Sequence, residues 1–250
     1  MSQNDQDQNT NKRANCLLAA MSEADYALLS PHLETVSLKR EKVLVEIGKP
    51  ISHCYFPEGG IASIVALSEE GDRTEVGIFG SEGVSAIPFL LGSDRSTNET
   101  FIQVDGATAL RIEVEKFRAA LEHSASLKEL MLHYVYTMTV QMSASVVSNA
   151  RLQIEGRLAR WLLMCRDRSD RDDIKLTHEF MAFMIGAQRS GVTLALHVLE
   201  GIGTIRSARG VVTILDRDKL VELAGDSYGE AEAEYRRLIG PFGNTLIRTL

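Results

Sequence analysis

The sequence predicts an α+β protein with an N-terminal antiparallel β-roll of the jelly-roll kind, a long central helix, and a C-terminal unit of helices with a hairpin. Three observations support this fold class. Residues 36–112 consist of short runs rich in β-branched residues that alternate with turn residues. Residues 130–150 have helical spacing and no formal charge. Residues 178–192 place alanine, glycine and valine at the spacing of two helices that cross at a tight turn.

The composition is that of a globular protein with enough apolar residues for a core. The chain has 250 residues, of which 44% are hydrophobic, and its formal net charge is −7. Basic and acidic residues balance from Glu155 onward, so residues 1–154 carry the whole net charge. The acidic excess argues against general coating of nucleic acid, whereas the neutral C-terminal part leaves room for a locally basic face.

The cysteines and the N-terminus indicate the compartment. Cys16, Cys54 and Cys165 lie far apart and form no CxxC pair, which excludes a disulfide scaffold and a cysteine-rich zinc or iron–sulfur site. Residues 1–16 are polar and lack the apolar core of a secretory signal. We therefore expect a disordered arm, reduced thiols and a cytoplasmic protein with no membrane partner.

Residues 17–124 are expected to form one domain. Residues 17–29 space their apolar groups at three and four, which predicts a short helix. The strand segments that follow are "EKVLVEIG", "SHCYFPEGGIASIVAL", "RTEVGIFG", "TFIQVDG" and "ATALRIEV". Glycines at their ends permit the positive φ of hairpin turns. Many short antiparallel strands with frequent turns predict a barrel or a roll.

Residues 125–153 are expected to form a dimerisation helix. Because no formal charge interrupts residues 130–150, this helix needs cover on more than one side. The β-roll can cover one face, and a second copy of the same helix is a natural cover for the other. Serine, glutamine and asparagine side chains make insertion into a membrane unfavourable. The apolar residues recur at steps of four and three: Met131, Val135, Met138, Met142 and Val146.

The segment "LTHEFMAFMIGAQRSGVTLALHVLE" matches a helix-turn-helix. Thr177 is a plausible start of the first helix, which makes His178 the first position of the motif. Ala182 then lies where the two helices cross closely, and Gly186 where the turn needs a positive φ. Val192 packs back on the first helix. The spacing predicts a second helix, from about residue 188, that is free to lie in a major groove of DNA.

The start of this second helix carries the candidate base-reading residues. Arginine can grip guanine O6 and N7 together, and glutamine can pair with adenine. The following "GTIRSARGVVTIL" reads as a hairpin, or wing, whose arginines are placed to touch phosphate or the minor groove. The candidate DNA-binding residues are Thr177, Gln188, Arg189, Ser190, Gly191, Thr193, Arg206 and Arg209.

With "EGRLARWLLM" upstream of this motif, and a predicted β-roll and long helix before both, residues 17–222 resemble the Crp/Fnr family of bacterial transcription regulators. The resemblance implies a cyclic-nucleotide-binding-like sensory roll over residues 17–124 and a dimerising helix over 125–153. It implies a winged helix-turn-helix over 154–222 that reads a two-fold-symmetric operator. It also matches Arg189 to the family's base-reading arginine, with Leu194 at a position that is often basic or polar in relatives.

The sensory half departs from the family pattern. Glu82 matches the glutamate that binds ribose in the nucleotide-binding members, but Thr97 and Asn98 stand where an arginine and a serine or threonine neutralise the phosphate. Arg95 and Ser96 come two residues too early. A buried phosphate without a fixed cation is unfavourable, so cyclic nucleotide is a doubtful effector and no cofactor is assigned. On the central helix, Met142 and Ser143 are the candidate effector contacts.

Two other classes of function compete with a DNA-binding regulator. One is a small-molecule or nucleotide-sensing module whose helix-turn-helix is vestigial. The other is an enzyme, but the sequence has no HExxH, P-loop or GxSxG motif and no paired nucleophile and base, so we expect no catalytic activity. We expect a homodimer, with RNA polymerase as a further candidate partner. The role of the tail, residues 223–250, stays open.

Overall fold

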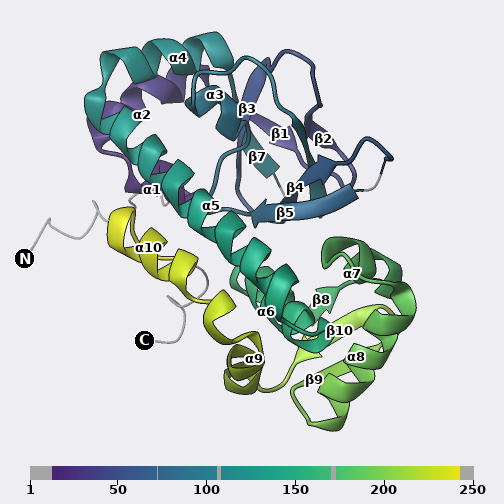
Figure 1. Ribbon diagram of the computed structural model, residues 1–250. Helices are drawn as coiled ribbons and strands as arrows, with labels where there is room; N and C mark the ends of the chain where they lie inside the picture. The colour runs from purple at the N-terminus through teal and green to yellow at the C-terminus, as the bar shows by residue number, and fades with distance from the viewer. Residues whose placement is uncertain (1–12, 72, 106–107, 170–172, 243–250) are drawn as a thin grey trace, which may run out of the picture.

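The computed structural model describes residues 13–71, 73–105, 108–169 and 173–242 (Figure 1). These residues form antiparallel sheets, one long central helix and a C-terminal helix-turn-helix, which confirms the predicted fold class. Residues 1–12 of the predicted arm lie outside the described residues. The predicted disorder does not extend to Asn15. Its side chain is buried and donates to the carbonyl oxygens of Pro57 and Gly83.

The N-terminal domain is a β-roll made of two antiparallel sheets. One sheet has the order β1-β7-β3 and the other the order β2-β6-β4-β5. Short helices precede and interrupt the strands, and the predicted single helix is split because Ser22 caps a second one. The helices are α1 (Cys16–Ala20), α2 (Glu23–Leu29), η1 (Ser30–His32), α3 (Ile87–Leu90) and α4 (Val114–His123). The strands are β1 (Glu34–Ser37), β2 (Val43–Val45), β3 (His53–Pro57), β4 (Ile61–Leu67), β5 (Arg73–Phe79), β6 (Asn98–Val104) and β7 (Thr108–Glu113).

The core of the roll lies between the two sheets and under the helices. Phe56 of β3, Phe79 of β5 and Phe117 of α4 are fully buried in it. Leu17 of α1 and Tyr134 of the central helix join the same cluster. Strands and helices that are far apart in sequence therefore share one apolar core, which is the main source of stability for such a roll.

The central helix α5 (Ala125–Arg151) covers the roll along one face only. Met131, Val135 and Met138, from the predicted apolar stripe, are buried. The Gln141 side-chain oxygen accepts a hydrogen bond of 2.8 Å from the backbone amide of Ile78 in β5. Val146, the last residue of the predicted stripe, is exposed, as are the large apolar residues Leu132, Tyr136 and Val147 of this helix.

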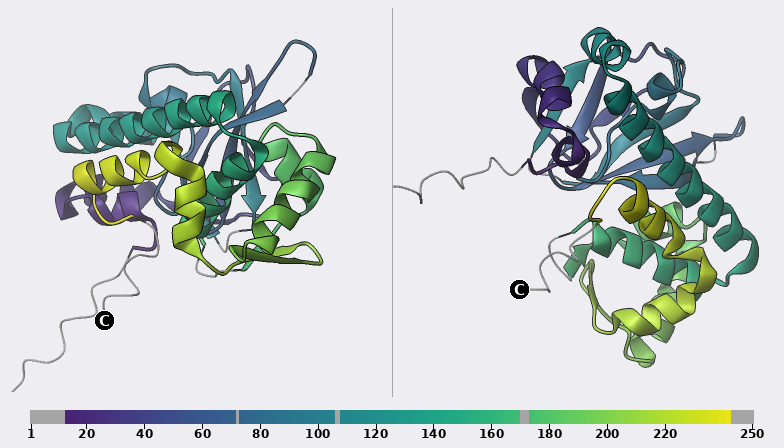
Figure 2. Two further views of the ribbon diagram at one scale, coloured as in Figure 1. Left: turned by 60° about the horizontal axis from the view of Figure 1, so that its bottom comes forward. Right: turned by 90° about the vertical axis from the view of Figure 1, so that its left-hand side faces the viewer.

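The C-terminal unit follows without a break from α5 and packs beneath the roll (Figure 2). Its helices and strands surround a second core, to which Ile61, Val65, Ile78 and Phe101 of the roll also belong. The three-stranded sheet has the order β8-β10-β9, and its first strand was not anticipated. The elements are α6 (Ile154–Asp167), β8 (Asp173–Lys175), α7 (His178–Met184), α8 (Arg189–Gly201), β9 (Ile205–Ala208), β10 (Val211–Ile214) and α9 (Arg217–Ala224).

The chain then turns back toward the roll. After η2 (Gly225–Ser227), helix α10 (Glu230–Leu238) runs beside the middle of α5 (Figures 1 and 2). The Arg160 guanidinium of α6 ties this return to the central helix, since it donates to the carbonyl oxygens of Ser227 at 2.7 Å and Gln141 at 3.1 Å. Residues 225–242 are called the C-terminal extension below; the rest of the predicted tail, 243–250, lies outside the described residues.

Candidate nucleic-acid interface

Helices α7 and α8 form the helix-turn-helix at the positions that the spacing predicted. The Thr177 side chain caps α7, since its oxygen accepts a hydrogen bond from the amide of Phe180 at 3.2 Å. Ala182 and Val192 are buried where the helices meet. Gly186 has φ +59° in the turn, a conformation that costs glycine little and other residues more.

The start of α8 is exposed. Gln188 is its N-cap residue, and the side chains of Gln188, Arg189 and Ser190 lie in solvent. Among the described residues, the Arg189 guanidinium has no hydrogen-bond or ion-pair partner. Its guanidinium is therefore available to a ligand, and the exposed amides at the start of a helix also favour an anion.

The structure gives Thr193 and Gly191 other contacts than the sequence suggested. The Thr193 hydroxyl donates to the carbonyl oxygen of Arg189 at 3.0 Å and lies 3.0 Å from His178 Nδ1. A Cβ on Gly191 would stand 2.7 Å from Ile154 Cδ1, so the close approach that needs this glycine is to α6. Gly191 therefore also takes part in the protein's own packing, and the expected close approach of a DNA backbone stays a prediction.

The wing is an antiparallel hairpin formed by β9 and β10. Its turn contains Arg209 at φ +47° and Gly210 at φ +77°. Arg206 and Arg209 are both exposed, in keeping with the predicted phosphate contacts, which stay a prediction. His197 is exposed on α8 and was missed; it lies eight residues after Arg189, a spacing that puts both on neighbouring parts of one helix face.

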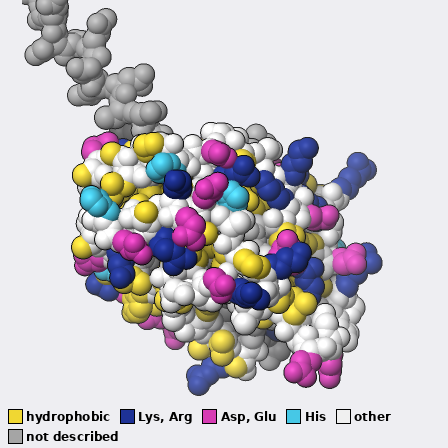
Figure 3. Space-filling model, turned by 90° about the horizontal axis from the view of Figure 1, so that it is seen from above, with side chains coloured by type: hydrophobic (Ala, Val, Ile, Leu, Met, Phe, Trp, Pro, Cys, Tyr) yellow, Lys and Arg dark blue, Asp and Glu magenta, His cyan; other side chains and the backbone are white. Residues whose placement is uncertain are grey.

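The opposite end of the molecule offers no comparable surface. Figure 3, seen from the roll end, has basic and acidic side chains interspersed over the whole face.

Within the described residues no group of histidine, cysteine and carboxylate side chains could hold a metal ion. No helix among them is both long and apolar enough to cross a membrane. The polar candidates for nucleic-acid contact thus gather on α8 and the wing.

The turn that carries Glu82 is closed by the protein itself. Glu82 Oε2 accepts from the amide of Gly80 at 2.8 Å, and Oε1 forms a buried ion pair of 2.7 Å with Arg168 Nε. Arg168, which follows α6, also donates to the carbonyl oxygen of Met164 at 2.8 Å. The carboxylate that the sequence matched to ribose binding is therefore already paired.

The C-terminal extension covers this ion pair. Tyr235 Oη donates to the carbonyl oxygen of Glu82 at 2.8 Å, and the Phe242 ring lies 5.2 Å from the Arg168 guanidinium carbon. A cavity of only about 10 Å³ remains between Glu82, α5 and α10, which is about the least that can hold one water molecule. A nucleotide does not fit there.

The other candidate effector residues are not gathered around Glu82. Arg95 donates to the carbonyl oxygen of Gly48 at 3.3 Å, and Ser96 bonds within its own loop to Asn98. Thr97 is exposed. On α5, Met142 is half-buried near Gly77 of β5, whereas Ser143 is exposed. The structure therefore does not favour a shared effector site of these residues.

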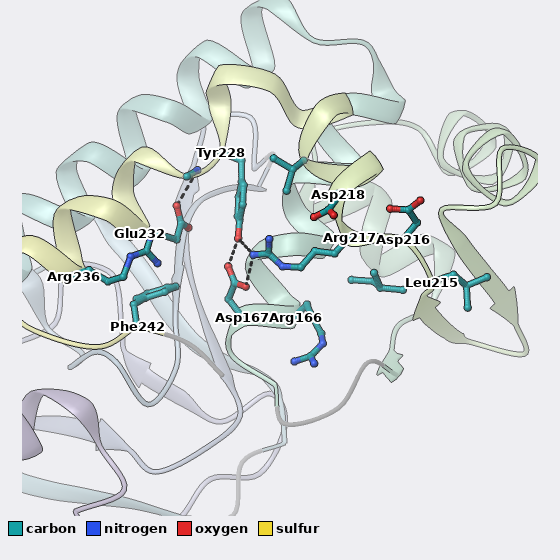
Figure 4. Close-up of a pocket in the computed structure, with 13 residues that line it drawn as sticks. Arg166, Asp167, Leu215, Asp216, Arg217, Asp218, Tyr228, Glu232, Arg236 and Phe242 are labelled. Carbon is teal, nitrogen blue, oxygen red and sulfur yellow. Dashed lines mark hydrogen bonds and ion pairs between the residues drawn. The ribbon is translucent and has the colours of Figure 1, made fainter. Parts of the chain in front are cut away.

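A larger cavity, of about 790 Å³, lies between the ends of α6, β10, α9 and α10 (Figure 4). Asp167 at its wall pairs with Arg217 at 3.0 Å and accepts from the Tyr228 hydroxyl. Arg166 and Arg236 also line it. The sequence contained no signal for this cavity, because its walls come from four elements spread over residues 166–242.

A buried contact joins the roll to the C-terminal unit. Trp161 Nε1 of α6 donates to Glu75 Oε1 of β5 at 2.8 Å, and Ser63 Oγ of β4 donates to Glu75 Oε2 at 2.7 Å. Burial raises the pKa of Glu75 to about 8, against the lowering effect of these hydrogen bonds and of the Arg160 and Arg168 charges. This carboxyl group is therefore mostly neutral at pH 7.

Comparison with known proteins agrees with the helix-turn-helix described above. Residues 156–223 match the family model of the Crp-like helix-turn-helix domain. The global nitrogen regulator of Synechocystis is 26% identical over 197 residues, which cover 75% of this chain and 86% of the relative. The transcriptional regulator SdrP of Thermus thermophilus is 26% identical over 199 residues, covering 76% and 94%.

Solved structures share the fold. A Crp/Fnr-family transcriptional regulator from Eubacterium rectale superposes with a TM-score of 0.64 at 21% identity, over 83% of this chain and 97% of that one. FixK2 from Bradyrhizobium japonicum has a TM-score of 0.67 at 15% identity, over 77% and 98%. Residues 156–223 thus form a Crp-like helix-turn-helix domain, and the chain as a whole has the fold of these Crp/Fnr-type structures.

Proposed function

We propose that the protein is a homodimeric regulator that binds a two-fold-symmetric operator through the exposed start of α8. The observation that carries this proposal is the unpartnered Arg189 guanidinium, which stands beside exposed Gln188 and Ser190 at the helix N-terminus. Arginine in this position can bind guanine through two hydrogen bonds. Arg206 and Arg209 of the wing supply phosphate contacts.

The exposed face of α5 supports dimerisation. Leu132, Tyr136, Val146 and Val147 remain in solvent along one side of the helix while its other side is buried. Apolar side chains aligned along a helix are stabilised when a second helix covers them. Two copies joined there would place two α8 helices for half-sites one helical turn, about 34 Å, apart.

The closed Glu82 turn supports DNA binding without a cyclic nucleotide. The C-terminal extension lies where Glu82 could otherwise meet a ligand, and Arg168 already neutralises the carboxylate. Such a regulator works in the cytoplasm, and RNA polymerase is the partner that it would meet at a promoter. Any signal then acts through another part of the molecule.

Selection of bound sequences from random DNA, with and without cyclic nucleotides, tests this function. We expect a palindromic site without added nucleotide, a dimer by sedimentation, and affinity that falls steeply with salt. Arg189→Ala should weaken binding to the selected site by about 1–3 kcal/mol and relax the preference at one position of each half-site.

Arg206→Ala is the matched control, because a phosphate contact carries no base preference. It should weaken specific and non-specific binding alike and reduce the salt slope by about 1. If Arg189→Ala binds the selected site as tightly as the wild type, the assignment of the base-reading residue is wrong.

The cavity of about 790 Å³ favours one alternative, a small-molecule sensor whose helix-turn-helix no longer binds DNA. This alternative predicts no salt-dependent retention on DNA and saturable heat of binding for a small ligand in calorimetry. A selected palindrome would contradict it.

A further inference from the structure

The exposed face of α8 contains a leucine that the protein's own core does not use. Leu194 is 62% exposed, more than any other large apolar residue of this helix. The buried side of α8 is complete without it, since Val192, Ala195, Leu196 and Leu199 are fully buried. An apolar side chain left this open gains free energy when a partner covers it.

The position of Leu194 relates it to the candidate base-reading residues. It lies four residues after Ser190, so the two share a face at the start of the helix. The nearest polar alternative is Thr193, whose hydroxyl is already bonded to the Arg189 carbonyl oxygen and lies next to His178. Beside the exposed Arg189 and Ser190, this part of α8 therefore also offers an apolar contact.

The major groove of DNA offers one apolar group to such a side chain, the 5-methyl group of thymine. We propose that Leu194 contacts the 5-methyl group of a thymine in each operator half-site, and thereby sets base preference next to Arg189. This inference rests on the proposed function, in which α8 lies in the major groove.

Two other exposed apolar residues follow, Val198 on the same helix at 42% and Ile202, the residue that caps its C-terminal end, at 46%. They lie about 6 Å and 12 Å further along the axis from Leu194, at 1.5 Å per residue. DNA is the partner expected to cover Leu194, because Arg189 and Ser190 lie at the same end of the helix. Ile202 belongs to the far end and serves as the control.

Replacement of thymine by uracil in the selected operator tests the contact, because it removes only the methyl group. With the full-length protein, fluorescence anisotropy should locate one thymine per half-site whose replacement weakens binding about fourfold, the effect of one buried methyl-sized group. Replacement in both half-sites should weaken it roughly fifteenfold, since the two contacts are independent.

Leu194→Ala should bind the thymine and uracil operators alike while keeping the guanine preference that Arg189 confers. Ile202→Ala should keep the wild-type difference between the two operators. Both side chains are exposed, so both variants should fold, and circular dichroism checks this.

Three results would overturn the inference: a specific operator with no methyl-dependent thymine, a Leu194→Ala variant that keeps the full difference, or loss of the difference in Ile202→Ala alone. Failure of the wild type to bind any specific site is a separate outcome. It would overturn the proposed function together with this inference, and the selection experiment detects it first.

Discussion

The start of α8 and the turn around Glu82 both carry charged side chains, but one is open and the other is closed by the chain itself. The Arg189 guanidinium stands in solvent without a partner among the described residues. The Arg168 side chain is only 2% exposed, pairs with Glu82 at 2.7 Å and lies under Phe242. Two arginines of the C-terminal unit thus have opposite surroundings, one exposed on α8 and one buried against the roll.

The difference shows how tertiary packing decides which charges remain available. A buried charge is tolerated only when a partner and hydrogen bonds compensate it, and a pair so compensated has little left to offer a ligand. An exposed arginine keeps its five donors for DNA. In this protein the C-terminal unit leaves Arg189 exposed, whereas its Arg168 pairs with Glu82 and closes that turn of the roll.

Removal of the buried Arg168 guanidinium should change the free energy of unfolding most. Arg168→Met leaves Glu82 buried without its partner, so the free energy of unfolding should fall by about 3–5 kcal/mol. Chemical denaturation measures this. Arg189→Met, which replaces the exposed arginine, should change the free energy of unfolding by less than about 0.5 kcal/mol.

A double variant separates loss of charge pairing from loss of packing. Glu82→Gln combined with Arg168→Met removes both charges and should recover most of the lost stability. If Arg168→Met alone were as stable as the wild type, Glu82 would not depend on this cation and the roll would not be closed in the way described.

Burial of the Glu75 carboxyl group should make stability depend on pH. The pKa of Glu75 is raised from an ordinary 4.5 to about 8 in the folded protein, so between these values only the folded state holds the proton. The stabilisation is complete below pH 4.5 and is lost as pH rises toward 8. In that window this group lowers the free energy of unfolding by about 1.4 kcal/mol per pH unit at most.

Glu75→Gln mimics the neutral carboxyl and should remove this slope, while Glu222→Gln, at an exposed position on α9, should leave it unchanged. Denaturation at several pH values between 5 and 8 measures both. An identical slope in the wild type and in Glu75→Gln would mean that Glu75 is ionised in the folded protein.

A substitution in the turn of the helix-turn-helix should change the free energy of unfolding least. Gly186 has φ +59° with open space around it, so Gly186→Ala adds backbone strain but no clash and should lower stability by about 1 kcal/mol. Gly201→Ala, at the end of α8 with open space and no positive φ, should not destabilise. A neutral Gly186→Ala would show that the turn can adopt another backbone conformation.

The prediction from sequence succeeded where the determining contacts are local. The cap at Thr177, the small residue at Ala182 and the glycine at position 186 all act within one helix pair, so their spacing predicted α7 and α8. Strand β8 was missed because its three residues become a strand only by pairing with β10.

The same limit applies to α5 and α8. The stripe of Met131, Val135 and Met138 faces the protein's own roll, and periodicity could not tell this face from the one left open for a second copy. The contact of Gly191 with Ile154 was not predicted, because Ile154 lies 37 positions earlier in the chain.

The amino-acid sequence by itself determined the order of the units, the helix-turn-helix and the arginine at its exposed end, because helix periods, caps and turns depend on neighbours along the chain. Only the tertiary structure decided that Glu82 is closed. Its partners Arg168 and Tyr235 follow it by 86 and 153 residues, and no local pattern encodes which distant side chains a fold will bring to a buried carboxylate.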